Sequence, residues 1–268
     1  MPMMINTNLA SMNAQRNTTT SQGALSTAMQ RLSSGLRVNS AKDDAAGLAI
    51  GQRMDAQARG MNVAIRNAND GISLTQTADG ALATVSDALQ RMRELSVQAA
   101  NGSNGTTDRA NLDTEYQQLA AQITDIAAQT KFNGKDILNT GAGAQAFQVG
   151  ANVGDTLTVT TNAVVTVGGG LTTVAAANTA LAAIDTKLDA INTDRATYGA
   201  AMNRLAFTSS NLQISSENQS AARSRIMDAD FASETANLSR AQILQQAGNA
   251  MVAQANQLPQ QVMTLLRG

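Results

Sequence analysis

Apolar and small residues recur at alternating intervals of three and four residues along the second half of the chain, with two polar interruptions at Arg195 and Ser209. The apolar and small members are Val174, Ala177, Leu181, Ile184, Leu188, Ile191, Tyr198, Met202, Leu205 and Leu212. A stripe with a period of about 3.5 residues keeps facing a neighbour only when helices supercoil around each other. The pattern therefore predicts a long helix over residues 174–219 that packs against partner helices.

A second long helix is predicted over about residues 44–99. Ser40 is placed as its N-cap, with Asp43 and Asp44 in the first turn, where carboxylates meet the positive end of the helix dipole. Its apolar stripe breaks near Asp79, so we expect a phase shift in the supercoil there.

A third helix is predicted over residues 112–130. The loop before it, residues 101–107, is short and rich in Asn, Gly and hydroxyl side chains, so this helix should lie antiparallel to the second one. Three long helices are enough to cover one another as a bundle.

The segment between the third helix and the long C-terminal stripe has strand-like spacing. The Asn133-Gly134 pair is typical of a tight hairpin turn. Residues 146–149 and 157–159 predict a short hairpin, and residues 164–167 are candidates for a further strand.

Both ends of the chain carry helical stripes that lack a partner next to them in sequence. Their apolar positions are Ile5, Leu9, Met12, Leu25, Met29 and Leu32 at the start, and Leu244, Met251, Leu258, Val262 and Leu265 at the end. Pro259 should kink the last helix. A few aliphatic side chains cannot offset the entropy of ordering such segments. We therefore expect the ends to be disordered in the monomer and to fold against other copies, which gives an open helical polymer.

Composition excludes several classes of function. The chain has no His and no Cys, so imidazole bases, thiolate nucleophiles and metal sites built on these ligands are ruled out. Asp43, Asp44, Asp228 and Asp230 could be imagined as a carboxylate metal site, but helix capping explains them better. A net charge of −1 offers no basic surface for nucleic acid. We predict no enzyme, no cofactor and no metal.

Targeting signals are equally sparse. The chain contains no run of 18 apolar residues, so no transmembrane helix is predicted. The first residues lack the pattern of an ordinary cleaved signal peptide. Composition alone leaves open a cytosolic protein or export by another route.

Six short motifs lie toward the two ends and in the middle of the chain: residues 5–9 (INTNL), 30–47 (QRLSSGLRVNSAKDDAAG), 132–134 (FNG), 224–231 (SRIMDADF), 242–248 (QILQQAG) and 265–268 (LLRG). Together they resemble the motifs of bacterial flagellin. The resemblance covers nearly the whole chain and identifies a minimal form with almost no variable outer domain. It implies a mainly α fold: a long antiparallel, coiled-coil-like bundle with a small β-hairpin and paired terminal helices.

The resemblance also implies a division of the chain. Residues 1–39 and 228–268 would be the inner-tube terminal helices. Residues 40–131 and 171–227 would form an outer-tube helical rod, and residues 132–170 the β-hairpin region.

By this resemblance the protein is a secreted, extracellular subunit that polymerises into the flagellar filament for motility. The alternative is a hook–filament junction protein of the same axial family. The main partner is another copy of the same protein, in a helical homopolymer. An export chaperone, cap and junction proteins are further implied partners, as is a host Toll-like receptor that would recognise Arg91, Leu95 and Glu115. For Arg91 a solvated helix face with local ion pairs is the plainer interpretation.

Overall fold

The computed structural model describes residues 7–165 and 167–265, and it describes side chains as far as residue 257. The chain forms two compact units, one of residues 57–217 and one of residues 1–56 with 218–268. Helices α2 (Ala45–Ala100) and α4 (Val174–Met227) each contribute to both units. The predicted division into inner-tube and outer-tube parts concerns positions in a filament, so it stays a prediction.

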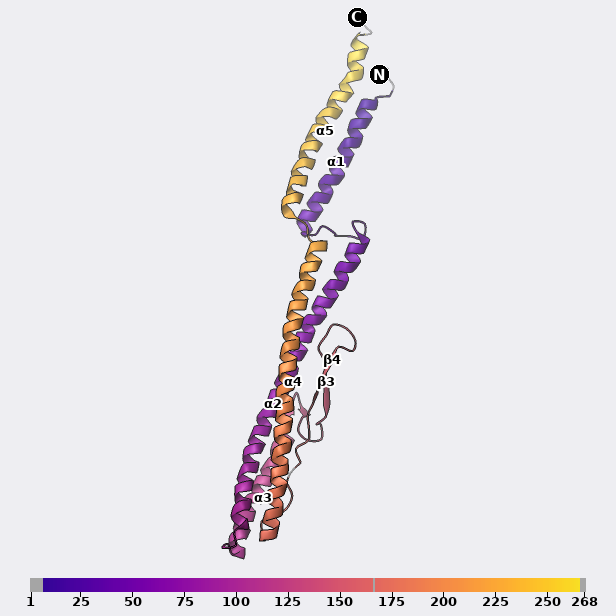
Figure 1. Ribbon diagram of the computed structural model, residues 1–268. Helices are drawn as coiled ribbons and strands as arrows, with labels where there is room; N and C mark the ends of the chain where they lie inside the picture. The colour runs from indigo at the N-terminus through magenta and orange to yellow at the C-terminus, as the bar shows by residue number, and fades with distance from the viewer. Residues whose placement is uncertain (1–6, 166, 266–268) are drawn as a thin grey trace. The chain divides into compact units, whose positions relative to one another are not determined.

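The unit of residues 57–217 is built around α2, α4 and helix α3 (Thr106–Gln129), as Figure 1 shows. Its core contains large side chains from all three helices, among them Leu82, Leu89, Met92, Tyr116, Ile123, Ile184 and Tyr198. The mainly α bundle predicted from sequence is confirmed.

Buried positions of α4 include a series that recurs at every seventh residue: Ala177, Ile184, Ile191, Tyr198, Leu205 and Leu212. This spacing is the signature of a seam in supercoiled helices, so the predicted ladder is confirmed from Ala177 onward, whereas Val174 is 38% exposed.

The seam of α2 also keeps its spacing, and the expected phase shift near Asp79 is wrong. Thr75 is followed in the buried stripe by Ala78 and then Leu82, and all three are at most 1% exposed. Because Ala78 is small, an apolar stripe judged by large side chains misses it. The stripe is continuous here, and its neighbour can approach closely.

Two small antiparallel sheets connect α3 to α4. Strands β1 (Lys131–Phe132) and β2 (Lys135–Asp136) flank Asn133 and Gly134, whose φ angles of 49° and 76° are those of the predicted tight turn.

The larger hairpin pairs β3 (Ala144–Gln148) with β4 (Thr156–Thr160), with Phe147 opposite Leu157. Leu157 and Val159 of β4 pack on Ala68 of α2 and Leu205 of α4. The larger predicted hairpin is therefore confirmed, and it covers one side of the helix pair.

The further strand proposed at residues 164–167 is absent from the described part of this segment. The amide of Val164 donates to the carbonyl of Leu138 at 2.9 Å, and Val167 is buried. The segment leads into α4 through a loop held on α3, where Asp113 Oδ1 accepts from the amide of Leu171 at 2.6 Å. Val164, Val167 and Leu171 therefore pack against the core of the bundle and do not extend a sheet.

The other unit contains helix α1 (Leu9–Ser34) beside helix α5 (Phe231–Leu265) (Figure 1). The described parts of both terminal segments are thus helices that pack on each other. The expected disorder of these segments in a free monomer stays a prediction. The helix of α5 continues through Pro259. The polar middle of α1 is helical as well, and hydroxyls such as that of Thr19 donate to the carbonyl four residues earlier.

The start of α2 differs from the sequence prediction in its cap. Asp44 lies just before the helix, and its Oδ1 accepts from the amide of Gly47 at 2.8 Å, so Asp44 is the N-cap residue. Asp43 instead closes a turn with Ser40, accepting from its amide and its hydroxyl, both at 2.9 Å. These hydrogen bonds, led by the Ser40 hydroxyl, lower the pKa of Asp43.

Candidate self-association surface

The interface between α1 and α5 is formed by two stripes of mostly small or polar residues. On α1 the less exposed positions are Ser11, Ala14, Thr18, Ser21, Leu25, Ala28 and Leu32. On α5 they are Glu234, Leu238, Ala241, Gln245, Gly248, Val252 and Ala255. Both stripes alternate by three and four residues, as a coiled-coil seam does. Most of these positions do not stand out in the sequence, because a stripe defined by large apolar side chains leaves small and polar residues out.

Small residues let the two helices come close. A Cβ atom built on Gly248 would lie only 2.6 Å from Thr18 Oγ1. Toward the far end of the pair, Asn8 donates through Nδ2 to the carbonyl of Ala255 at 2.8 Å, and Ser11 Oγ donates to Asn256 Oδ1 at 2.7 Å. Polar contacts and close backbones therefore hold this pair together.

An ion pair and a backbone bridge complete the pairing at the opposite end. Arg31 Nη1 lies 3.8 Å from Glu234 Oε1. The segments after α1 and before α5 form an antiparallel bridge between Leu36 and Asp228, and the amide of Ala229 donates to the carbonyl of Gly35 at 2.9 Å. These contacts fix the register of the two helices.

Large apolar side chains of the pair lie outside this seam and are exposed, and Leu244 among them borders a groove that it shares with Ala24 and Ala28 of α1. The exposed ones are Leu9 (66%), Met12 (54%), Met29 (57%), Phe231 (57%), Ile243 (65%), Leu244 (51%) and Met251 (63%). Apolar residues concentrated on an exposed helical surface mark a protein–protein contact. We call this set the outward apolar surface.

The predicted polymerisation residues divide between the seam and this surface. Leu9, Met12, Met29, Leu244 and Met251 belong to the outward apolar surface. Leu25 and Leu32 are half-buried in the seam. Ile5 lies outside the described residues, and Leu258, Val262 and Leu265 lie beyond the last described side chain, within or at the end of the α5 helix.

The predicted receptor residues do not all reach the surface. Arg91 donates through Nε to Glu115 Oε1 and through Nη1 to Glu94 Oε2, both at 2.9 Å, and all three side chains are exposed. These bonds, led by the one to Glu94, raise the pKa of Arg91. Leu95 is only 1% exposed and belongs to the α2 seam. The side chain of Leu95 is therefore not accessible to a receptor in the folded subunit.

Two of the four acidic residues considered as a metal site, Asp44 and Asp230, cap helices. Asp230 Oδ1 accepts from the amide of Ala232 at 3.0 Å at the start of α5, in the way that Asp44 caps α2. In the described part of the chain, no group of three or more His, Cys, Asp or Glu side chains is arranged to hold a metal ion.

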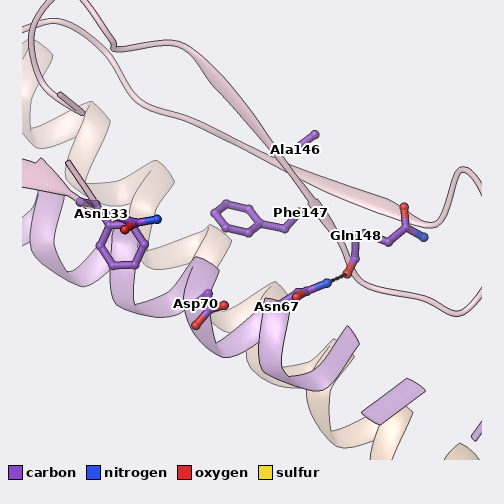
Figure 2. Close-up of a pocket in the computed structure, with 7 residues that line it drawn as sticks. Asn67, Asp70, Asn133, Ala146, Phe147 and Gln148 are labelled. Carbon is purple, nitrogen blue, oxygen red and sulfur yellow. Dashed lines mark hydrogen bonds between the residues drawn. The ribbon is translucent and has the colours of Figure 1, made fainter. Parts of the chain in front are cut away.

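A pocket of about 450 Å³ lies between α2, the β1–β2 turn and β3. Figure 2 shows Asn67 donating to the carbonyl of Gln148, at 2.9 Å, beside Phe147, Asn133 and Asp70. Asp70 is the one titratable group in its lining, so the pocket offers no acid–base pair.

None of the helices in the described ranges combines the length and apolar character needed to cross a bilayer. The fold and the outward apolar surface instead define a helical structural subunit that is made to associate with other protein.

Comparison with known proteins identifies the family. The bacterial flagellin N-terminal helical region matches residues 5–142, and the bacterial flagellin C-terminal helical region matches residues 181–266. A flagellin of Halalkalibacterium halodurans is 47% identical over 272 residues, covering 99% of this chain and 100% of the relative. The chain belongs to the bacterial flagellin family.

Two further relatives agree with this assignment. The flagellar filament 33 kDa core protein of Treponema phagedenis is 40% identical over 286 residues, covering 99% of this chain and all of the relative. The crystal structure of Bacillus cereus flagellin matches with a TM-score of 0.50 and 39% identity, covering 55% of this chain and 88% of that one.

Family membership decides the general function. The chain is a structural subunit of the extracellular bacterial flagellar filament, exported by the flagellar system and associating with copies of itself. It is a structural protein and not an enzyme, and with 268 residues it is a minimal flagellin. No finding favours the junction-protein alternative.

Proposed function

We propose that this subunit polymerises by burying the outward apolar surface of α1 and α5 against neighbouring copies. The observation that carries the proposal is the inverted packing of this helix pair, in which Leu9, Leu244 and Met251 are more than half exposed while Ala28 and Ala241 are buried. Burial of an apolar side chain of this size contributes roughly 1.5–3 kcal/mol. Several such side chains in each subunit therefore supply a substantial driving force for a polymer.

The proposal extends to the placement of the chain in the filament. Residues 1–39 and 228–268 form the inner tube, residues 40–131 and 171–227 the outer tube, and residues 132–170 a hairpin on the outer tube. The support is that the residues expected inside include the outward apolar surface, while the bundle of residues 57–217 already covers its own core.

The decisive experiment changes Leu244 and Met251 to Asp together. Both positions are on the exposed side of α5, so the subunit should keep its helical content and the unfolding transition of its bundle. Two charges on the buried side of a subunit contact should stop growth from added filament seeds. Sedimentation and electron microscopy measure that growth.

A matched control exchanges the same two side chains conservatively, Leu244→Met with Met251→Leu, and should assemble at the normal rate. Normal filament growth by the aspartate variant would overturn the proposal, since the surface would then not be buried in the polymer.

The same surface suits the partners expected before assembly. We include in the proposal an export chaperone that covers the apolar side of α5, and cap and junction proteins that contact the terminal helices of the first and last subunits. The aspartate variant should then also bind the chaperone more weakly in titration calorimetry. Equal affinity would separate the chaperone site from the assembly surface.

Recognition by a host Toll-like receptor is proposed at Arg91 and Glu115. Their support is an exposed ion pair that joins α2 to α3 and orients both side chains. Arg91→Ala should lower receptor activation in a reporter assay, while Arg93→Ala on the same helix should leave it unchanged. An unaltered response to Arg91→Ala would contradict this assignment.

A further inference from the structure

The methionines of this chain divide sharply by exposure. Among the described side chains, the exposed ones are Met12 (54%), Met29 (57%) and Met251 (63%), and all three lie on α1 or α5. Met92 and Met227 are at most 5% exposed, and Met54, Met61 and Met202 are half-buried. The accessible thioethers are therefore gathered on the outward apolar surface.

We propose that Met12, Met29 and Met251 are oxidation sites for peroxides, and that their oxidation prevents an unassembled subunit from joining a filament. The inference rests on the proposed function, because it needs this surface to be buried between copies. It adds a form of regulation to that surface: the redox state of the surroundings decides whether a free subunit remains competent.

The chemistry needs only the thioether and a hydroperoxide. A lone pair of the sulfur attacks one peroxide oxygen, the O–O bond breaks, and that oxygen stays on the sulfur. The sulfur-bound oxygen then gives up its proton, and the departing hydroxide takes up a proton, directly or through solvent, and leaves as water. The methionine loses two electrons and the peroxide gains them. The product is methionine sulfoxide, which is polar and chiral.

The positions of the sulfurs explain the expected effect. Met12 lies one helical turn after Leu9, and Met251 lies two turns after Leu244, so these two sulfurs sit in stripes with an exposed leucine, while Met29 is 57% exposed on α1. A sulfoxide oxygen there is an unpaired acceptor once a neighbouring copy covers it, and this cost is absent in the free subunit. Oxidation should therefore leave the fold intact and weaken assembly.

The order of events also matters. In a finished filament the same sulfurs are covered, so they should be protected. Peroxide should consequently stop growth of new filament while leaving existing filament unmodified at these three positions.

The test begins with dilute full-length subunits treated with hydrogen peroxide and mapped by mass spectrometry. Met12, Met29 and Met251 should be oxidised before Met92 and Met227. Growth from untreated seeds should then fall by about tenfold or more. Treatment with methionine sulfoxide reductases of both stereospecificities should restore growth.

Two matched variants assign the effect to these sulfurs. The triple exchange Met12→Leu, Met29→Leu and Met251→Leu keeps the surface apolar and should assemble normally both before and after peroxide. The triple exchange Met54→Leu, Met61→Leu and Met202→Leu keeps the proposed sites and should still lose assembly after peroxide.

Loss of assembly by the peroxide-treated Met12/Met29/Met251 variant would overturn the inference, since the damage would then lie elsewhere. Normal growth of wild-type protein oxidised at all three sites would also overturn it. Failure of the proposed function looks different, because the Leu244→Asp, Met251→Asp protein would then assemble without any oxidant.

Discussion

The two helical interfaces of this flagellin have the same periodicity and opposite composition. The seams of α2 and α4 bury Leu82, Leu89, Ile184 and Tyr198, whereas the seam between α1 and α5 buries small or polar residues such as Ala28 and Ala241. Spacing alone therefore determines which positions face a partner helix. The size of the side chains at those positions determines whether the pair is complete in one subunit.

The consequence is a difference in self-sufficiency. The largest fully buried side chains of the described chain lie between Leu82 and Leu205, within the unit of residues 57–217. Each stabilises the bundle by roughly 1.5–3 kcal/mol through burial. The α1–α5 pair keeps comparable side chains outside, so its stability should depend on the neighbours that cover them.

Amide hydrogen exchange should show the largest contrast. In dilute subunits we expect the amides of the α2–α4 core to exchange on the order of a thousandfold more slowly than those of α1 and α5. Assembly into filament should remove most of that difference. Equal protection of both regions in free subunits would mean that the terminal pair is complete without neighbours.

Two isoleucines offer a direct comparison between the regions. Ile184 is fully buried, so Ile184→Ala should lower the free energy of unfolding of the bundle by about 2–5 kcal/mol. Ile243 is 65% exposed on α5, and Ile243→Ala should change subunit stability by less than about 0.5 kcal/mol. Urea unfolding measures the first effect.

The effect of Ile243→Ala on assembly is measured by filament growth. Ile243→Ala should raise the subunit concentration needed for growth, because it removes part of the surface that neighbours cover. A large loss of subunit stability from this exchange would show that Ile243 is packed within the subunit after all.

Glycine exchanges test the close approach of α1 and α5. A side chain at position 248 meets Thr18 Oγ1, so Gly248→Val should weaken the pairing by about 1–3 kcal/mol. Gly23 on α1 has open space around its Cβ position, and Gly23→Ala should stabilise α1 by up to about 1 kcal/mol. Circular dichroism of thermal unfolding compares the two, and similar effects would contradict the seam described here.

The two tyrosines lie in the bundle, and their exchanges to Phe should have small effects on its stability. Tyr116 is buried and its hydroxyl makes no hydrogen bond to the described residues, so Tyr116→Phe should be neutral or slightly stabilising at pH 7. The hydroxyl of Tyr198 accepts from the amide of Asn162 at 3.3 Å, so Tyr198→Phe should cost about 0.5–1.5 kcal/mol. Urea unfolding at pH 7 distinguishes them.

Alkaline pH extends the tyrosine comparison. Burial raises the pKa of both Tyr116 and Tyr198. As pH rises past about 10, the unfolded chain loses these protons before the folded one does, so bundle stability should fall. The double exchange to Phe should reduce that slope. An unchanged slope would indicate that other groups cause the alkaline loss.

Much of the fold follows from the sequence, because the patterns there are physically direct. The three-and-four spacing predicts the long helices, and Asn133-Gly134 predicts the tight turn through its two positive φ angles. What the sequence hid was the contribution of small residues. Ala78 keeps the α2 seam in phase, and Gly248 with Ala241 forms the terminal seam, yet neither stands out from a stripe defined by large side chains.

The assembly surface was only partly predictable for the same reason. The sequence indicated an apolar stripe at each terminus, but an apolar stripe does not say whether it faces the partner helix or the outside. The structure places Leu25 in the seam and Leu244 outside it. On α2, neighbouring positions in the sequence can lie on opposite sides of the seam boundary: Glu94 is exposed, whereas Leu95 is packed in the core.

The hydrogen bond from Asn8 to Ala255 joins positions 247 residues apart. During synthesis or passage through an export channel, the leading segment cannot close this contact until nearly all of the chain has emerged. Helix α1 can therefore reach its final packing only after α5 has emerged. A subunit still in transit consequently lacks a finished end with which to join a growing filament too early.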